Sequence, residues 1–253
     1  MIIIKTQEEI ETMQEGGRIL AEVMRQMGEI VLPGNNTFEI NELAKKLILA
    51  SGGTPIFEGY GDKINPFPAA VCTSINNEIV HGVPRKDRII REGDLVKLDI
   101  GMSYKGMITD MARTFSAGSI SDEAQKLMDT TRMCLDEGID AIKIGAKLSD
   151  YSKAVEKYVK SQGFSIVRDL VGHGVGKKLH EDPYIPNYYA KTRDIIFKEG
   201  MTLALEPMIN AGTHYIKLLK DGWTYATKDG KLSAHFEDTV AITKDGVKIL
   251  TRL

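Results

Sequence analysis

Four carboxylates and one histidine stand in sequence contexts that favour chemistry over simple solvation. Asp99 and Asp110 lie within runs that alternate apolar and polar residues, and Glu206 and Glu237 each adjoin a short apolar run. His173 stands between glycines, which allow close backbone approach and leave the imidazole unobstructed. Acids within strands are seldom left in a protein core without a partner. Together these groups carry a charge of −4, which two divalent cations would neutralise.

The spacing of Asp99 and Asp110 predicts a hairpin around residues 104–106. The two numbers sum to 209, which centres the turn between residues 104 and 105. In that register the aspartates lie directly opposite each other on antiparallel strands and point to the same face. Because like charges so placed repel, a shared proton, a basic partner or a metal ion must compensate them. For such a pair taken alone, two solvated strand acids are the alternative.

The donor types indicate which metals fit. Mostly oxygen ligands with one nitrogen favour Mn, Fe or Co, allow Zn, and exclude a structural zinc site of the cysteine type. Two ions about 3.5–4 Å apart can hold a bridging water, lower its pKa and stabilise the tetrahedral oxyanion of amide hydrolysis. No other nucleophile stands out, since the sequence has no Gly-x-Ser-x-Gly, no phosphate-binding GxxxxGK[ST] and no Rossmann glycine run.

Two further histidines accompany these groups. His81 lies in a His-Gly-Val step that His173 repeats, and His180 follows His173 by seven residues. A lone histidine is more often structural than functional. Three of the five histidines, His81, His173 and His180, lie in predicted loops and accompany four acids in predicted strands. This combination favours a functional interpretation.

The predicted elements occur in the same order twice. Helices are predicted from about residue 7, after a Thr6/Glu9 capping box, then over 38–50, from 122 and from 150, with a strand at 94–100. Glu92–Asp99 aligns with Glu199–Glu206, each a Glu-Gly turn, a strand and an acid seven residues after the first Glu. We therefore expect a single catalytic domain, 1–253, with related halves at about 5–118 and 119–253.

Composition excludes several classes of protein. The chain has 253 residues with 33 Lys+Arg and 35 Asp+Glu, so the net charge of −2 argues against nucleic-acid binding driven by a basic face. Its 42% apolar and 27% charged residues are typical of globular proteins, and no stretch reaches the roughly 20 apolar residues of a membrane span. With only Cys72 and Cys134, the chain fits a reducing cytoplasm.

The motifs resemble those of the methionine aminopeptidases, in particular the short type I class. The likeness spans essentially the whole chain and rests on Ile79–Pro84, Leu98–Ile100, Thr109–Asp110, Gly172–Gly176, Leu205–Pro207 and Phe236–Thr239. The resemblance implies an α/β pita-bread fold, in which two helix-helix-strand halves related by a pseudo-twofold axis surround a central antiparallel sheet. Two departures are Asp238, where the family often has histidine, and a longer segment at 59–65.

The resemblance also implies a role for each metal-site residue. Asp99 would hold one ion, His173 and Glu206 the other, and Asp110 with Glu237 would bridge them. Glu206 would also be the general base that activates the bridging water.

Substrate contacts follow from the same resemblance. His180 would hydrogen-bond the scissile carbonyl or its oxyanion, and His81 would act near the substrate nitrogen. The methionine side chain would contact a pocket formed by Phe67, Cys72, Trp223 and Tyr60, with Phe57 nearby. Aromatic rings and sulfur suit a flexible thioether.

The implied function is hydrolytic removal of the initiator methionine from nascent proteins and peptides when the second residue is small, with two divalent ions as cofactors. We expect a cytoplasmic monomer that contacts the ribosome at most transiently and has no nucleic-acid or membrane partner. The alternatives are a proline-specific aminopeptidase of the same fold and a catalytically inactive scaffold.

Overall fold

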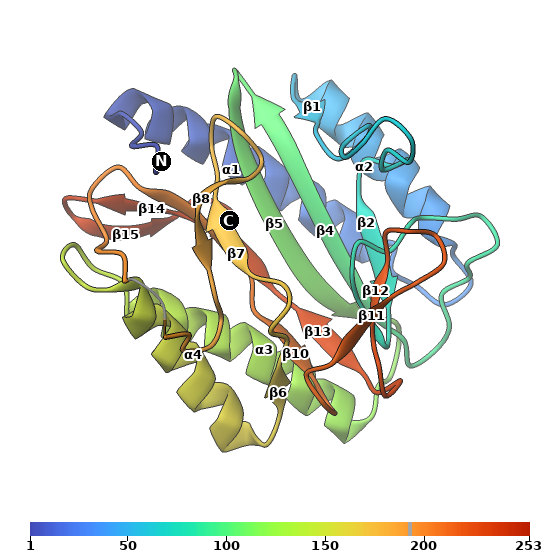
Figure 1. The fold of residues 1–253 in the computed structure, drawn as a ribbon. Coiled ribbons are helices and arrows are strands. Elements are labelled where there is room, and N and C mark those ends of the chain that lie inside the picture. Colours follow the sequence, from blue (N-terminus) through green and yellow to red (C-terminus); the bar gives the residue numbers. More distant parts are fainter. Residues whose placement is uncertain (192–193) are drawn as a thin grey trace.

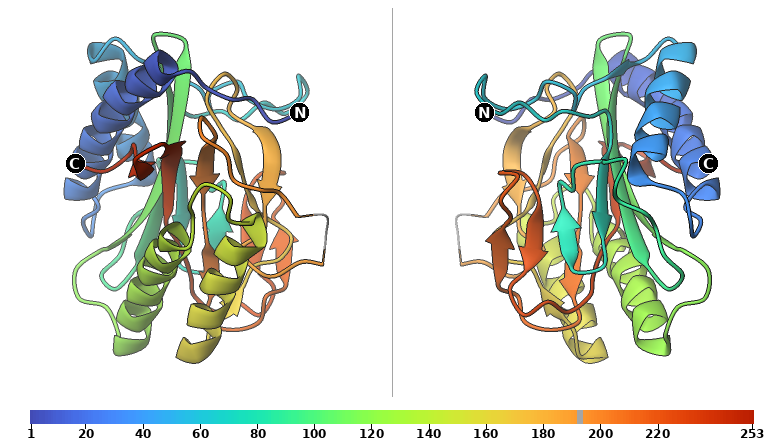
Figure 2. Two further views of the ribbon diagram at one scale, coloured as in Figure 1. Left: turned by 90° about the vertical axis from the view of Figure 1, so that its left-hand side faces the viewer. Right: turned by 90° about the vertical axis from the view of Figure 1, so that its right-hand side faces the viewer.

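The computed structural model describes residues 1–191 and 194–253. In this part of the chain, four helices lie in two pairs on one side of a curled antiparallel sheet (Figures 1 and 2). The helices are α1 (Gln7–Glu29), α2 (Thr37–Ala50), α3 (Asp122–Asp140) and α4 (Leu148–Gln162). The predicted α/β class and the central antiparallel sheet are confirmed. None of these helices has the length and apolar character that crossing a bilayer requires.

Side-chain caps set the first residue of three helices. Before α1, the Thr6 hydroxyl accepts from the Glu9 N–H at 3.2 Å, and Glu9 accepts from the Thr6 N–H at 2.9 Å. Asn36 and Glu39 form the same reciprocal pair before α2, and Ser121 caps α3. These caps satisfy backbone donors that the first helical turn leaves free. The predicted capping box at residue 6 is confirmed.

The main sheet runs in the order β1-β4-β5-β14-β9-β7-β8, with β2 added beside β4 and β15 beside β14. Two smaller sheets, β13-β10-β6 and β11-β12-β3, flank it. The strands described are β1 (Thr54–Pro55), β2 (Cys72–Ile75), β3 (Glu78–Val80), β4 (Leu95–Tyr104), β5 (Met107–Ser116), β6 (Ser165–Ile166), β7 (Gly172–Gly174), β8 (Glu181–Ile185), β9 (Thr202–Leu205), β10 (Met208–Asn210), β11 (Ile216–Leu218), β12 (Tyr225–Thr227), β13 (Ser233–His235), β14 (Glu237–Thr243) and β15 (Gly246–Ile249).

The β4–β5 hairpin has a different register from the predicted one. Asp99 pairs with Ala112, which lies two residues beyond Asp110, so the prediction that the two aspartates are directly opposite is wrong. The turn consists of Lys105 and Gly106, both with positive φ (49° and 81°), and is therefore centred one residue later. Two-residue turns of this kind match the twist of the strands. Because side chains alternate, both aspartates still point to the same face.

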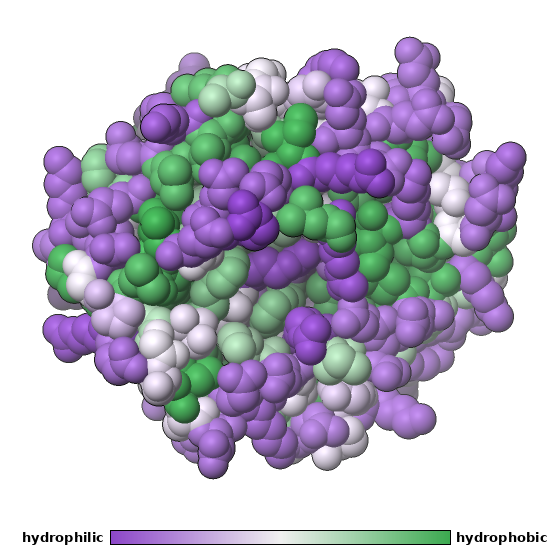
Figure 3. Space-filling model, turned by 180° about the vertical axis from the view of Figure 1, so that it is seen from behind, coloured by the Kyte–Doolittle hydropathy of each residue, from purple (hydrophilic) through white to green (hydrophobic). Residues whose placement is uncertain are grey.

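The two faces of the sheet carry different side chains: one packs against the helices, and the other carries the acids. Leu98 and Ile100 point to the helix side, where they are fully buried with α1 and α2, and Leu203 and Val240 pack in the same way beneath α3 and α4. Asp99, between the two β4 apolar residues, points to the opposite face. The outer surface on the helix side shows mostly hydrophilic side chains with an apolar band among them (Figure 3). The helices thus shield one face and leave the other for polar groups.

Asp238, where the family often has histidine, lies outside the cavity that the acids line. It is fully buried on the helix side of β14 and accepts from Arg113 Nη2 at 2.6 Å, Arg252 Nε at 2.8 Å and Thr251 Oγ1 at 2.9 Å. Arg113 also donates to the backbone carbonyl of Glu237. Asp238 therefore anchors its strand from behind, and its side chain takes no part in lining the cavity on the other face.

A buried ion pair fastens the N-terminal segment to the start of β8. The side chains of Lys5 and Glu181 are each only 1% exposed, and Glu181 also accepts from the backbone N–H groups of Lys177 and Lys178 at 2.6 and 3.0 Å. Burial lowers the pKa of Lys5, and the hydrogen bond with Glu181 opposes that shift. Glu181 directly follows His180, so this contact holds the loop that carries the histidine.

Replacing Lys5 with methionine is expected to lower the free energy of unfolding by about 3–5 kcal/mol, because it leaves a buried carboxylate without its cation. The change is measured by urea denaturation. Lys5→Met combined with Glu181→Gln should recover much of the loss, since glutamine still accepts from the backbone. As a control, Lys177→Met removes the more exposed pair with Glu9 and should cost less than about 1 kcal/mol. Additive losses in the double variant would refute the coupling.

Candidate active site

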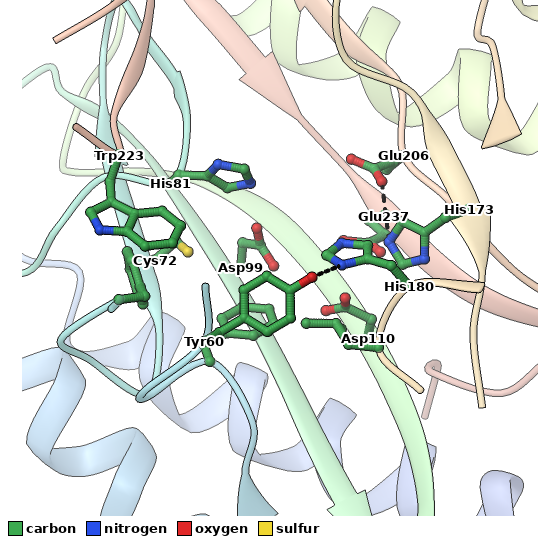
Figure 4. A pocket seen from close by; sticks show the side chains of 13 residues that line it. Tyr60, Cys72, His81, Asp99, Asp110, His173, His180, Glu206, Trp223 and Glu237 are labelled. Atoms are coloured by element: carbon green, nitrogen blue, oxygen red, sulfur yellow. Dashed lines mark hydrogen bonds and ion pairs between the residues drawn. The ribbon is translucent and has the colours of Figure 1, made fainter. Parts of the chain in front are cut away.

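A cavity of about 80 Å³ opens on the sheet face away from the helices and contains every residue that the sequence singled out for chemistry or substrate contact (Figure 4). One water needs about 10–15 Å³ of such space, so the cavity has room for several waters or one short side chain. Its lining consists of Phe57, Tyr60, Phe67, Cys72, His81, Asp99, Asp110, His173, Leu179, His180, Glu206, Trp223 and Glu237.

Four strands, and the residue that follows a fifth, each contribute one donor to the polar wall. Asp99 is on β4, Asp110 on β5, Glu237 on β14 and His173 on β7, while Glu206 directly follows β9. These strands are consecutive in the sheet order β4-β5-β14-β9-β7. Side chains that point to the same face of adjacent strands must converge. The sheet therefore gathers residues that are up to 138 positions apart, from Asp99 to Glu237.

The donor atoms are close enough to share cations. One ligand atom from each of Asp110, His173 and Glu237 lies within 4.8 Å of the other two. His173 Nε2 is 3.5 Å from Glu206 Oε1, and Asp99 faces the same space. In Figure 4, Asp110, Glu206, Glu237 and His173 lie on one side of the view, Cys72 and Trp223 on the other, and Asp99 between the two groups.

The buried carboxylates of this wall lack a positively charged partner among the described residues. Among the described residues, Asp99 Oδ1, Asp110 Oδ1 and Glu237 Oε1 are buried without a hydrogen-bond partner. Burial raises the pKa of Asp99 to about 7, and burial together with the neighbouring carboxylates raises the pKa values of Asp110, Glu206 and Glu237. In the described part of the chain, no lysine or arginine pairs with these acids. The donor set thus fits divalent cations.

His173 is prepared to act as a neutral nitrogen ligand. Its Nδ1 lies 2.9 Å from the carbonyl oxygen of Gly174, which requires the proton on Nδ1 and leaves the Nε2 lone pair free. Burial, and to a smaller extent the nearby His180, lowers the pKa of His173 to about 4. At neutral pH the ring is therefore uncharged, as metal binding requires.

The opposite wall is apolar. Phe57, Phe67, Cys72 and Leu179 form one buried cluster, against which Trp223 packs. The Phe67 and Trp223 rings meet edge to face with centroids 5.3 Å apart. Burial raises the pKa of Cys72 well above its ordinary value, so the residue is a neutral thiol. This wall suits an unbranched side chain with a polarisable sulfur.

Two histidines stand between the walls. His180 Nδ1 is 2.5 Å from the Tyr60 hydroxyl, and the His180 ring lies 4.4 Å from that of His173. His81 has a positive φ of 58°, an uncommon conformation that only the surrounding structure can impose. Burial, and to a smaller extent the nearby His180, lowers the pKa of His81 to about 4. Both side chains reach the space between the acids and the apolar wall.

The segment at 59–65 forms part of the cavity rim through Tyr60. Asn65 Nδ2 donates to the Asp221 carbonyl at 3.2 Å, in the connection between β11 and β12. Gly61 lies against Trp223, where a β-carbon would be only 2.6 Å from the indole ring. The segment therefore supports Trp223 from outside the pocket.

Sequence reasoning missed two residues. Leu179 completes the apolar wall, and its signal was an apolar residue beside His180. His235 lies behind Glu206, with its Nε2 at 3.7 Å from Glu206 Oε2. It precedes Glu237 by two residues, and strand periodicity alone could have placed both on the same face.

Comparisons with known proteins agree with this geometry. Residues 11–244 match the model of metallopeptidase family M24. The chain is 44% identical over 251 residues to the methionine aminopeptidase of Clostridium acetobutylicum, with 99% of each chain covered. It is also 44% identical to methionine aminopeptidase 1 of Bacillus subtilis over the whole of both chains.

Solved structures extend the comparison to the fold. The crystal structure of the methionine aminopeptidase from Thermotoga maritima superposes with a TM-score of 0.96 at 40% identity and covers all of both chains. The prolidase from Pyrococcus furiosus has a TM-score of 0.78 at 24% identity, with 66% of its length covered, and shows the shared fold alone. The pita-bread architecture implied by the motifs is confirmed. The chain belongs to metallopeptidase family M24 and, within it, to the methionine aminopeptidases.

Proposed function

We propose that this chain hydrolyses the peptide bond after an N-terminal methionine when the second residue is small, with two divalent cations as cofactors. One observation carries the proposal: a single small cavity has five metal-type donors on one wall and an apolar, sulfur-containing surface on the other. A methionine side chain fits the second wall and leaves its peptide bond beside the first.

The donors divide naturally between two ions. Asp99 would hold one, His173 and Glu206 the other, and Asp110 with Glu237 would contact both. Three of these five side chains have buried oxygens without a partner among the described residues, which supports the assignment. Cations bound there supply Lewis acidity, because they lower the pKa of water and polarise the scissile carbonyl. The metal in use in the cell would be Mn, Fe, Co or Zn.

Glu206 is the proposed general base. It follows the last residue of β9 and its side chain keeps 14% exposure, so that water can reach it while the other acids are more deeply buried. The carboxylate accepts a proton from the attacking water and can return it to the leaving amine.

The two histidines between the walls, His81 and His180, would contact the backbone of the substrate. His180, oriented by the Tyr60 hydroxyl, donates a hydrogen bond to the carbonyl oxygen as negative charge develops on it. His81 lies near the amide nitrogen that becomes the new chain end. The polar wall would receive the free α-amino group, which explains cleavage at chain ends only.

The proposal extends to the setting of the reaction. The substrates would be the N-terminal methionines of nascent polypeptides and peptides, met in the cytoplasm by a monomer that contacts the ribosome at most transiently. A proline-specific activity has less support, since the prolidase structures are similar in fold alone. An inactive scaffold would not require all five donors, and each of them is present.

Metal dependence and specificity are tested together. Protein stripped with a chelator should release no amino acid from Met-Ala-Ser, Met-Leu-Ser or Ala-Pro-Ala. Titration with Mn, Fe, Co or Zn should restore methionine release from Met-Ala-Ser alone. Free amino acids are quantified by mass spectrometry. Cleavage of only Ala-Pro-Ala would move the activity to the proline-specific branch, and no release with any metal would favour a scaffold.

His180→Ala is expected to lower kcat about 10²–10³-fold, because it removes a donor to the developing oxyanion. KM for Met-Ala-Ser should change little, since the bond strengthens mainly in the transition state. Tyr60→Phe, which keeps the imidazole and removes only its hydroxyl partner, should lose less. Steady-state kinetics give both constants. A His180→Ala enzyme with unchanged kcat would contradict the assigned role.

Cys72→Leu is expected to lower kcat/KM for Met-Ala-Ser by about 10-fold or more, because added methyl groups occupy space needed by the methionine side chain. Cys72→Ser keeps the size and serves as the control. Affinity for Mn²⁺, measured calorimetrically, should be unchanged in both variants. If Cys72→Leu retained full kcat/KM, methionine would have to bind elsewhere.

A further inference from the structure

His235 is a buried histidine for which the proposed reaction has no use. The residue is 1% exposed at the end of β13, and neither ring nitrogen has a hydrogen-bond partner among the described residues. His173 and His180, by contrast, each engage a ring nitrogen. A buried polar group left unpaired destabilises the folded state. A nearby partner that can hydrogen-bond to one of the His235 ring nitrogens would remove this destabilisation.

Glu206 is that partner. Its two carboxylate oxygens face two different imidazoles: Oε1 is 3.5 Å from His173 Nε2, and Oε2 is 3.7 Å from His235 Nε2. A shift of about half an ångström brings the second contact to hydrogen-bond length. A carboxylate that binds a cation is ionised and only accepts, so in the metal-bound protein His235 would be the donor and carry its proton on Nε2.

The backbone holds His235 in place for this contact. Its N–H donates to the Thr114 hydroxyl at 3.0 Å, and its carbonyl accepts from the same hydroxyl at 2.8 Å. It also pairs with Met208, two residues after Glu206, across the β10–β13 ladder. The backbone of His235 is thus held by β5 and by the strand that follows Glu206, so the Glu206 carboxylate is the part that adjusts.

We propose that His235 is a positioning residue for Glu206: its Nε2–H donates to Oε2 and thereby keeps Oε1 directed at His173 and the metal site. Without this donor the carboxylate can rotate about its last bonds, and Asp99 and Asp110 repel it from the orientation that binding requires. Hydrogen bonds to ligating carboxylates are worth about 10–100-fold in metal affinity or activity. The inference rests on the proposed function of Glu206 as ligand and base.

Two substitutions separate donation from packing. His235→Gln retains an N–H donor of similar reach, whereas His235→Leu fills the space without one. Calorimetric titration of chelator-stripped full-length protein with Mn²⁺ should show affinity about 10–100-fold weaker for His235→Leu and within about threefold of the parent for His235→Gln. On Met-Ala-Ser, His235→Leu should lose kcat with little change in KM. His214→Leu, which removes a histidine stacked on Tyr215 outside the cavity, is the matched control and should resemble the parent.

A measurement on the unaltered protein covers the case in which His235→Leu does not fold. Nitrogen NMR of the ¹⁵N-histidine-labelled, Zn²⁺-loaded protein reports which ring nitrogen carries the proton, and His235→Gln assigns the signal. The proposal requires Nε2–H. A proton on Nδ1, parental Mn²⁺ affinity in His235→Leu, or an equal loss in the glutamine variant would each overturn it. If the parent itself bound no Mn²⁺ and cleaved no peptide, the proposed function would fail instead.

Discussion

The structure is organised around one electrostatic constraint, which is the gathering of four carboxylates in a single small cavity. Unpaired charges in a protein interior are strongly unfavourable, and here the acids lack any lysine or arginine partner among the described residues. Their raised pKa values express the same conflict. Divalent cations held by these residues would relieve it and would also supply the Lewis acidity that hydrolysis requires. The cost of assembling the site is thus directly linked to its function.

The rest of the fold supplies the rigidity that such a site needs. One face of the sheet is closed by the four helices, and strand alternation places Leu98 and Ile100 there while Asp99 points the other way. Behind Glu237, the buried Asp238 accepts from Arg113 and Arg252 and secures the strand. Repulsion between the acids on the open face is therefore resisted by ordered contacts on the closed face.

The two walls of the cavity come from different parts of the fold. Its apolar wall is built largely from loops and from β2, and it is supported from outside by the segment around Gly61 and Asn65. Its polar wall comes from consecutive strands of the main sheet. Glu206 directly follows one of these strands, and its two carboxylate oxygens face His173 on one side and His235 on the other. Loops can adapt the pocket without disturbing the donor geometry.

The sequence by itself determined the local features and the chemical class. Thr6 and Glu9 are three residues apart, so their cap could be predicted without any knowledge of the fold. Strand alternation and the motif residues identified the donors, and the structure brings all of them to one cavity. These features depend on neighbours along the chain or on patterns with a fixed period.

Tertiary structure alone decided the features that depend on long-range placement. The register of Asp99 against β5 was set by the positive φ of Lys105 and Gly106, which moved the turn by one residue. The approach of His235 to Glu206 joins residues 29 positions apart, and the pairing of Lys5 with Glu181 joins residues 176 positions apart. No periodic pattern encodes such contacts, because they arise from how the sheet curls and how its strands are ordered.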